Sequence, residues 1–310
     1  MFQIILKRIL IAIPVLLCVA AITFFLIRLA PGGPFDSEKV VPPEILKNLN
    51  ERYNLNAPVH IQFFDYMKNV VQGDFGPSFR HPNRSVSEMI FIGLPVTFEL
   101  GCYALLVALG AGITAGVTAS LRPNTIFDYL PMSISMVGIC MPNFLLGPLL
   151  ILIFGIWFEW LPVSGWNEIP GDKILPAITL GSVYAAYVAR LSRGGMLEIL
   201  SQDFIRTARA KGVPEYRIVI QHALKGGLLP VVSFLGPAAA WLLTGSFVIE
   251  TIFQIPGLGR FFIQAAFNRD YTMIMGTTIF LSTLIILFNL LSDILTIFLN
   301  PKLKYDISQD

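Results

Sequence analysis

Six long apolar runs, each long enough to cross a lipid bilayer as a helix, constrain this chain more than any other feature. A helix rises about 1.5 Å per residue, so about 20 apolar residues cover the roughly 30 Å of hydrocarbon. Only 14% of the 310 residues are charged, whereas soluble domains have roughly 25%. We therefore expect an all-α membrane protein with six transmembrane helices, at residues 9–29, 96–121, 129–157, 174–191, 228–252 and 274–299.

Lysine and arginine are distributed unevenly between the short loops, and this predicts the orientation of the helices. The segment 30–95 is left out of the count, because loops beyond about 60 residues cross the membrane regardless of their charge. Twelve of the remaining basic residues then fall on the side that holds both termini, whereas three, Lys173, Arg260 and Arg269, fall on the other side. The positive-inside rule therefore places both termini and the 190–227 loop in the cytoplasm. The formal net charge is only +2, which gives no reason to expect a nucleic-acid partner.

The runs divide the chain into four regions. The first run is too long for a signal peptide and lacks a small-residue cleavage site, so we expect it to be a retained helix. An external segment follows it, then a core of five helices, then a short cytoplasmic tail. These regions are 1–29, 30–95, 96–299 with its cytoplasmic loop 192–227, and 300–310.

The external segment has helical spacing of apolar residues at 43–53 and 58–71, so we expect it to be folded. Ser85 and Glu88 have the spacing of a capping box, which would start a helix leading into the second run. The segment could be a solvated cap or a docking surface for something delivered from outside. In the helix at 58–71, the expected apolar positions are Ile61, Phe64, Tyr66 and Val70.

The apolar runs lack the groups that would support ion-coupled transport or catalysis. Asp293 is the only charged residue well inside its run, and we interpret it as a carboxylate near the interface rather than a proton relay. The sequence has no phosphate-binding loop, no nucleophile elbow and no zinc helix. We expect no catalytic residue, no metal site and no cofactor on this chain. We interpret Cys18, Cys102 and Cys140, which lie inside apolar runs, as buried thiols.

Two further patterns lie within the runs. Ala104, Ala108, Gly112 and Gly116 repeat every four residues and would let a neighbouring helix approach closely, most simply within the same chain. The third and fifth runs combine prolines with polar side chains, which suits helices that line a polar path. Alternatively, the hydroxyls could satisfy backbone groups freed by the prolines. The candidates for lining the path are Ser133, Ser135, Asn143, Ser233, Thr244 and Ser246.

A short amphipathic helix is expected in the cytoplasmic loop, ending at Gly212 and Pro214. Phe204, Ile205 and Ala208 would form its apolar face. Such a helix could lie on the bilayer or fit a groove in a partner protein. The residues concerned are Phe204, Ile205, Arg206, Thr207, Ala208, Arg209, Ala210, Lys211 and Gly212.

On the external side, the short segment 255–262 follows the fifth run. We expect it to act as an outer gate or docking loop, or else to be a plain re-entrant turn. The candidate residues are Glu250, Pro256, Gly257 and Gly259.

Six short stretches form a pattern that runs in order along almost the whole chain. They are Arg-Leu-Ala-Pro-Gly at 28–32, Gly-Asp-Phe-Gly-Pro-Ser at 73–78, Phe-Ile-Arg-Thr-Ala-Arg-Ala-Lys-Gly at 204–212, His-Ala-Leu-Lys at 222–225, Glu-Thr-Ile-Phe at 250–253 and Pro-Gly-Leu-Gly at 256–259. Together they resemble the membrane subunits of binding-protein-dependent ABC importers, in particular the peptide and nickel branch. Ala208 and Gly212 keep the spacing of that family's Glu-Ala-Ala motif, although Arg206 replaces its acid.

The resemblance implies a type I importer permease fold in a bacterial inner membrane. This chain would form half of an oligopeptide pathway, completed by a second homologous permease. Two cytoplasmic ATPases would bind ATP and Mg²⁺ and receive the 204–212 coupling helix, and an external peptide-binding protein would deliver the substrate. The same frame could carry dipeptides, antimicrobial peptides or chelated nickel. Outside the family, the competing hypotheses are an ion-coupled secondary transporter or channel and an intramembrane enzyme.

Overall fold

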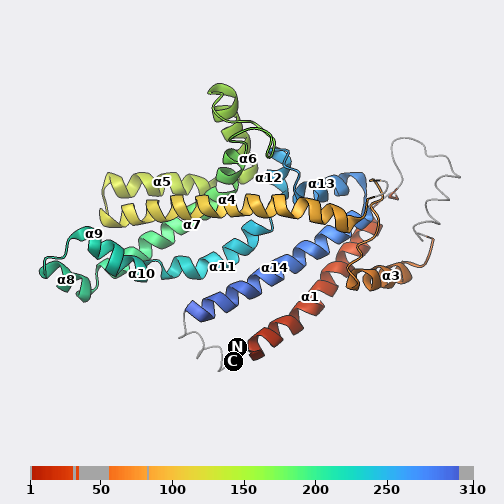
Figure 1. Ribbon diagram of the computed structural model, residues 1–310, viewed down its shortest axis with the longest axis horizontal. Coiled ribbons are helices and arrows are strands. Elements are labelled where there is room, and N and C mark those ends of the chain that lie inside the picture. The colour runs from red at the N-terminus through yellow and green to blue at the C-terminus, as the bar shows by residue number, and fades with distance from the viewer. Residues whose placement is uncertain (1, 31–32, 35–55, 82–83, 300–310) are drawn as a thin grey trace. The chain divides into compact units, whose positions relative to one another are not determined.

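The computed structural model describes residues 2–30, 33–34, 56–81 and 84–299 (Figure 1). Within these residues the fold is helical, and pairing between extended segments is limited to one isolated bridge, Pro77 with Ser85. The helix expected at 43–53 and the tail 300–310 lie outside the described residues.

The chain folds as two compact units, which are described separately. Unit 1 comprises Met1–Val96 and Pro256–Ile286, and unit 2 comprises Thr97–Ile255 and Leu287–Asp310. The division falls inside two long helices, α4 (Val86–Leu121) and α14 (Tyr271–Leu299).

The helices agree with the six expected membrane spans. Five are long and apolar enough to cross a membrane, and a bent pair of helices makes up to six. Several begin earlier or end later than the apolar runs, since polar turns at their ends remain helical. The spans are α1 (Phe2–Leu29), α4, the pair α5 (Ile126–Cys140) and α6 (Asn143–Leu150) with the π-helix η1 (Ile151–Trp157), α7 (Ile174–Leu200), α11 (Leu229–Leu243) with α12 (Phe247–Ile252), and α14.

The third span is not one continuous helix, contrary to the expectation for 129–157. The chain bends by 113° between Cys140 and Asn143. Met141 adopts extended angles, φ −91° and ψ 117°, as expected for the residue before Pro142. The proline therefore ends α5 and starts α6, and the run of apolar residues conceals this break.

The fifth span is also interrupted, contrary to the expectation for 228–252. Helix α11 ends at Leu243, and Gly245 has a φ of +81°, a conformation that favours glycine. The Ser246 hydroxyl then accepts a hydrogen bond of 3.4 Å from the Ile249 N–H and caps α12. A glycine and a serine cap thus make two helices out of one apolar run.

In unit 1, α3 (Val59–Val71) packs on α1 and α14 through a face that includes two of the four expected positions, Tyr66 and Val70. Ile61 and Phe64 are exposed, at 42% and 69%. The packed positions recur three to four residues apart, which is one stripe of a helix. They are Phe63, Tyr66, Met67 and Val70, against Ala20, Phe24, Met275 and Ile279.

The stretch 73–78 is fixed to the start of α14 through Asp270, which is 1% exposed. The Ser78 hydroxyl donates to the Asp270 carboxylate, which also accepts from the Met273 N–H at 3.2 Å and so caps α14. The Ser85 hydroxyl accepts from the Glu88 N–H at 3.1 Å, which confirms the cap expected at the start of α4.

In unit 2, α7 is the central helix and contacts α5, α6, α10 (Leu224–Gly227), α11 and α12. The stripe of small residues on α4 packs against it, as expected for packing within the chain. A side chain at Gly112 would overlap with Val188, and one at Gly116 would overlap with Ser192. Close contact between α4 and α7 therefore depends on these two glycines.

The three cysteines do not fill buried space, contrary to expectation. Cys18 and Cys140 are exposed, and Cys102 is half-buried. Apolar surroundings in the sequence therefore did not imply burial of Cys18 and Cys140 within the chain.

Candidate functional site

The expected amphipathic helix of the 192–227 loop is present as α8 (Asp203–Ala210). Ile205 is fully buried and Ala208 is partly buried, in a cluster with Met196, Ile218 and other apolar residues. Phe204 is not part of this apolar face, because 51% of it is exposed. The helix therefore binds its own unit through Ile205 and presents Phe204 outward.

Basic side chains cover the outward surface of α8. Arg206 is exposed and lies 3.5 Å from Asp203, and Arg209 forms an ion pair of 2.6 Å with Glu215. The Arg209 guanidinium donates to the Glu215 carboxylate and so holds the pKa of that carboxyl below its ordinary value. The same hydrogen bond raises the pKa of Arg209.

Gly212 ends this segment in a left-handed conformation, with a φ of +77°. The Val213 N–H then donates to the Ala208 carbonyl at 3.2 Å, which closes the end of α8. A glycine was expected to stop this helix, and its positive φ is the reason.

Helix α8 is held close to the end of α7. Met196 of α7 and Ile205 of α8 are both fully buried in the same cluster, together with Ile218 and Ala223 of the π-helix η2 (Ile218–Ala223). A methyl group on Gly195 would overlap with the Gly227 carbonyl, so α7 and α10 also approach at backbone distance. The end of α7, α8 and the segment up to α10 form one packed assembly (Figure 1).

An ion pair joins this end of α7 to α5. The Arg193 guanidinium donates from Nε to Asp128 Oδ1 at 2.6 Å and from Nη2 to Oδ2 at 2.7 Å. Sequence reasoning missed this pair. The only indications in the sequence were Asp128, directly before the apolar run 129–157, and Arg193, at the start of the 192–227 loop.

The candidates for an outer gate do not form one loop. Glu250 lies on α12 in unit 2 with no solvent exposure, and Thr97 Oγ1 donates to its Oε1 at 2.9 Å. Gly257 is the N-cap of α13 (Leu258–Asn268) in unit 1, where Gly259 is also buried and Pro256 is exposed. In the segment 255–262, residues 255–257 are not helical and α13 begins at Leu258.

Most hydroxyls among the path-lining candidates bond to their own helices. Ser135, Ser233 and Thr244 each donate to the carbonyl four residues earlier, at 2.8, 3.2 and 3.0 Å. Their acceptors are the carbonyls of Pro131, Leu229 and Ala240. None of these stands four residues before a proline, so these contacts do not satisfy the carbonyls that the prolines free. Ser233 is nevertheless also exposed, as is Ser133. Asn143, beside the break in the third span, has a buried Oδ1 with no hydrogen-bond partner among the described residues.

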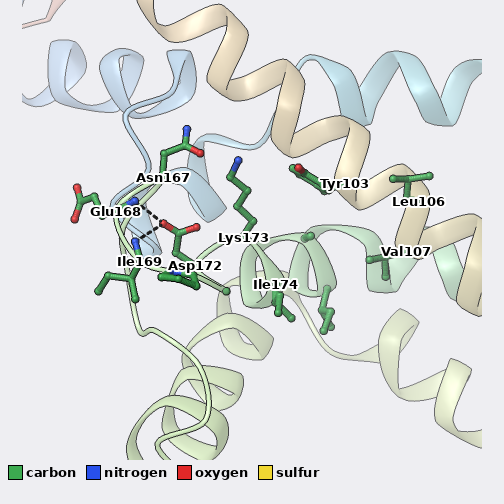
Figure 2. A pocket seen from close by; sticks show the side chains of 13 residues that line it. Tyr103, Leu106, Val107, Asn167, Glu168, Ile169, Asp172, Lys173 and Ile174 are labelled. Carbon is green, nitrogen blue, oxygen red and sulfur yellow. Dashed lines mark hydrogen bonds between the residues drawn. The ribbon is translucent and has the colours of Figure 1, made fainter.

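A cavity of about 730 Å³ opens between α4, the loop before α7 and the first turns of α7 (Figure 2). Tyr103, Leu106 and Ile174 contribute apolar walls, and charged side chains surround its mouth. Lys173 pairs with Glu99, and its Nζ lies 5.4 Å from the centre of the Tyr103 ring. Sequence reasoning treated these charges only as loop or interfacial groups and did not predict the cavity.

Asp172 shapes the mouth of this cavity. Its Oδ2 accepts hydrogen bonds from the Glu168 and Ile169 N–H groups, at 2.9 and 3.3 Å, as Figure 2 shows. The apolar walls of the cavity thus lie beside a charged turn that Asp172 holds in place. Within the described residues, no group of three or more His, Cys, Asp and Glu side chains could hold a metal ion.

The fold is that of a class of membrane proteins found in ABC transporters, since it is similar to chains of two solved ABC transporter structures. One is from a structure of the MetNI methionine ABC transporter in inward-facing conformations, with a TM-score of 0.53 and 19% identity, covering 68% of this chain and 96% of that one. Another is from an amino acid ABC transporter solved with histidines, with a TM-score of 0.51 and 19% identity, covering 67% of this chain and 92% of that one.

Sequence comparisons identify the family. Residues 109–305 match the binding-protein-dependent transport system inner membrane component, and residues 1–101 match the N-terminal part of such components. The oligopeptide transport system permease proteins OppB of Haemophilus influenzae and Salmonella typhimurium are 46% identical over 306 residues, covering 98% of this chain and 100% of theirs. The dipeptide transport system permease protein DppB of Bacillus subtilis is 42% identical over 289 residues, covering 93% of this chain and 94% of its own. This chain belongs to the binding-protein-dependent transport system permeases of ABC importers.

Proposed function

We propose that this chain is one of two permease subunits of an ATP-driven oligopeptide importer in a bacterial inner membrane. The observation that carries this proposal is the 46% identity to oligopeptide permeases over 98% of the chain. A dipeptide substrate is the second candidate, because a dipeptide permease is 42% identical over 93% of the chain. Antimicrobial peptides or chelated nickel would be further cargoes of the same frame.

The sequence has no phosphate-binding loop, and α8 presents an exposed surface, so we expect partner subunits that bind ATP and contact this helix. ATP and Mg²⁺ would bind to two cytoplasmic ATPases, and α8 would enter a groove on one of them. The exposed Phe204 and the basic groups around it suit an apolar groove with an acidic rim. This assignment places α8 and both termini in the cytoplasm, in agreement with the distribution of lysine and arginine.

A second, homologous permease would complete the pathway. Exposed apolar side chains cover most of α5, including Phe127, Leu130, Ile134 and Val137, and would meet either the lipid or that permease. An external binding protein would deliver peptide to the opposite side of the membrane, where segment 30–95 lies in this orientation. Ser133, Asn143 and Ser233 remain candidates for lining the path.

The test is purification of the chain, tagged after Asp310, from its native membrane, followed by identification of the subunits that accompany it. Reconstituted in vesicles with its binding protein, the complex should take up peptides of four or five residues only with ATP. Preference for dipeptides would favour the second candidate. A chain that purifies alone and drives uptake by an ion gradient would contradict the importer proposal.

A further inference from the structure

The side chain of Asp128 is buried and bound through both of its carboxylate oxygens. This residue is 2% exposed and is the only residue of this helix, all of which the structure describes, that is fully buried. Both carboxylate oxygens accept from Arg193, and Oδ2 also accepts from the Asn124 N–H at 3.0 Å. A planar guanidinium bound through two parallel hydrogen bonds fixes direction as well as distance.

The neighbours of Asp128 on α5 do not anchor the helix in this way. Phe127 and Tyr129 are exposed at 54% and 58%. Helix α5 packs along α7, and Gly138 lies near the Ser182 backbone, but the first turns of α5 bury a side chain fully only at Asp128. The ion pair is therefore the fixed point at this end of α5.

Arg193 stands one helical turn before Met196, the residue of α7 that packs with Ile205 of α8. A displacement of α8 therefore reaches Arg193 through a short segment with a buried, tightly packed interior. From Arg193, the pair leads to α5, and α5 ends at the 113° break before α6. The chain of contacts runs from α8 to the broken span.

We propose that Asp128 and Arg193 are positioning residues for transport, forming the rigid link through which movement of α8 is passed to α5. This inference rests on the proposed function, in which α8 is the contact with an ATPase. The Asp128 side chain is removed from water while that of Arg193 is 31% exposed. Such a pair gains little net stability, so a directional link explains the geometry better than stability alone. Transport then needs the pair, whereas ATP hydrolysis by the partner subunits does not.

The first test uses the intact complex in vesicles and compares Asp128→Asn, Arg193→Gln and the double variant with the wild type. We expect each single variant to need at least about five times more ATP per substrate molecule, with normal assembly. The double variant should match the single variants rather than multiply their effects, because either change alone breaks the link. Arg122→Gln is the matched control, since this exposed cation in the turn between α4 and α5 lies over the Phe127 ring and not on Asp128. Unchanged coupling in both single variants would overturn the proposal.

The second test does not depend on the substrate. Spin labels at Ser201 and Val137, both exposed, report the distance from the end of α7 to α5 after Cys18, Cys102 and Cys140 are replaced by alanine. In the wild-type complex we expect the same narrow distance without nucleotide and with trapped ATP and vanadate. Asp128→Asn should broaden it. A distance that changes with nucleotide in the wild type, or one that Asp128→Asn leaves narrow, would overturn the rigid link. Failure of peptide uptake by the wild type, with the narrow distance kept, would contradict only the substrate.

Discussion

Thr97 Oγ1 lies 2.9 Å from Glu250 Oε1 and donates a hydrogen bond to it, which joins α4 to α12 around a carboxylate with no solvent exposure. The two residues are separated by 153 positions in the sequence. Gly245 lies against both, because a side chain there would overlap with Thr97 and lie 2.7 Å from Glu250 Oε1. The break in the fifth span is therefore built around a buried acid.

Replacing Thr97 by valine should destabilise unit 2 by about 1–3 kcal/mol, because a buried carboxylate loses a donor. The measurement is thermal unfolding of the purified chain in detergent. Thr118→Val is the control, since this exposed hydroxyl of the same helix donates only to carbonyls of its own helix, at 2.7 and 3.0 Å. Equal losses of stability in the two variants would show that the hydrogen bond to Glu250 contributes no more than one within a helix.

Ile205 and Phe204 are adjacent in α8, but replacing one should affect stability and replacing the other should affect coupling to ATP hydrolysis. Ile205→Ala empties a fully buried position and should cost about 2–5 kcal/mol of stability. Phe204→Ala removes a side chain that is 51% exposed, so it should leave unfolding nearly unchanged and reduce peptide-stimulated ATP hydrolysis. Unfolding curves and ATPase assays on both variants separate the two effects. A stable Phe204→Ala complex with full coupling would contradict the contact between α8 and an ATPase.

Tyr66→Phe should stabilise unit 1 by about 1 kcal/mol. The Tyr66 hydroxyl is buried without a hydrogen-bond partner among the described residues, so its removal ends a desolvation cost. Burial also raises the pKa of this phenol, which keeps it neutral at any pH of interest. Tyr129→Phe, at an exposed position, should leave the unfolding temperature unchanged. A lower unfolding temperature for Tyr66→Phe would reveal a partner for the hydroxyl.

The Arg209–Glu215 pair should make the turn after α8 sensitive to acid. Because the folded state lowers the pKa of Glu215 from its ordinary value of 4.5, the contribution of the pair is complete above pH 4.5. It is lost as the pH falls through the lowered pKa. Amide hydrogen exchange in residues 203–217 should therefore increase at acidic pH, after correction for the intrinsic rate. Glu215→Gln should remove that dependence, and an identical profile in this variant would assign the acid response to another group.

The positions of the spans could be predicted from sequence because the bilayer demands about 20 apolar residues for each crossing. The breaks at Pro142 and Gly245 could not, because hydropathy is equally high on both sides of each break. The same limit affected α3, where Phe63 and Phe64 are equally apolar and only the packing partners select Phe63.

At the candidate site, the residue types predicted a helix at 203–210 and its stop at Gly212. They did not predict that Ile205 would be buried and Phe204 exposed, since both are apolar neighbours. Asp128 and Arg193 are 65 residues apart. Neither stands out alone, and only the packing of α5 on α7 brings the two charges together.

The 113° bend at Pro142 also bears on how long the chain can persist in a membrane by itself. The last carbonyls of α5 lack N–H donors from a following helical turn, because the helix stops there. In hydrocarbon, each unsatisfied backbone group costs several kcal/mol, so such a break must be covered by protein or by water. Helices α5 and α6 both pack on α7, so this chain covers part of the bend, and in the proposed importer the second permease would cover the rest. A copy made without that permease would leave part of the bend exposed to lipid and would become a substrate for membrane proteases. The amount of this chain in the cell should then follow the supply of its partner rather than the rate of its own synthesis.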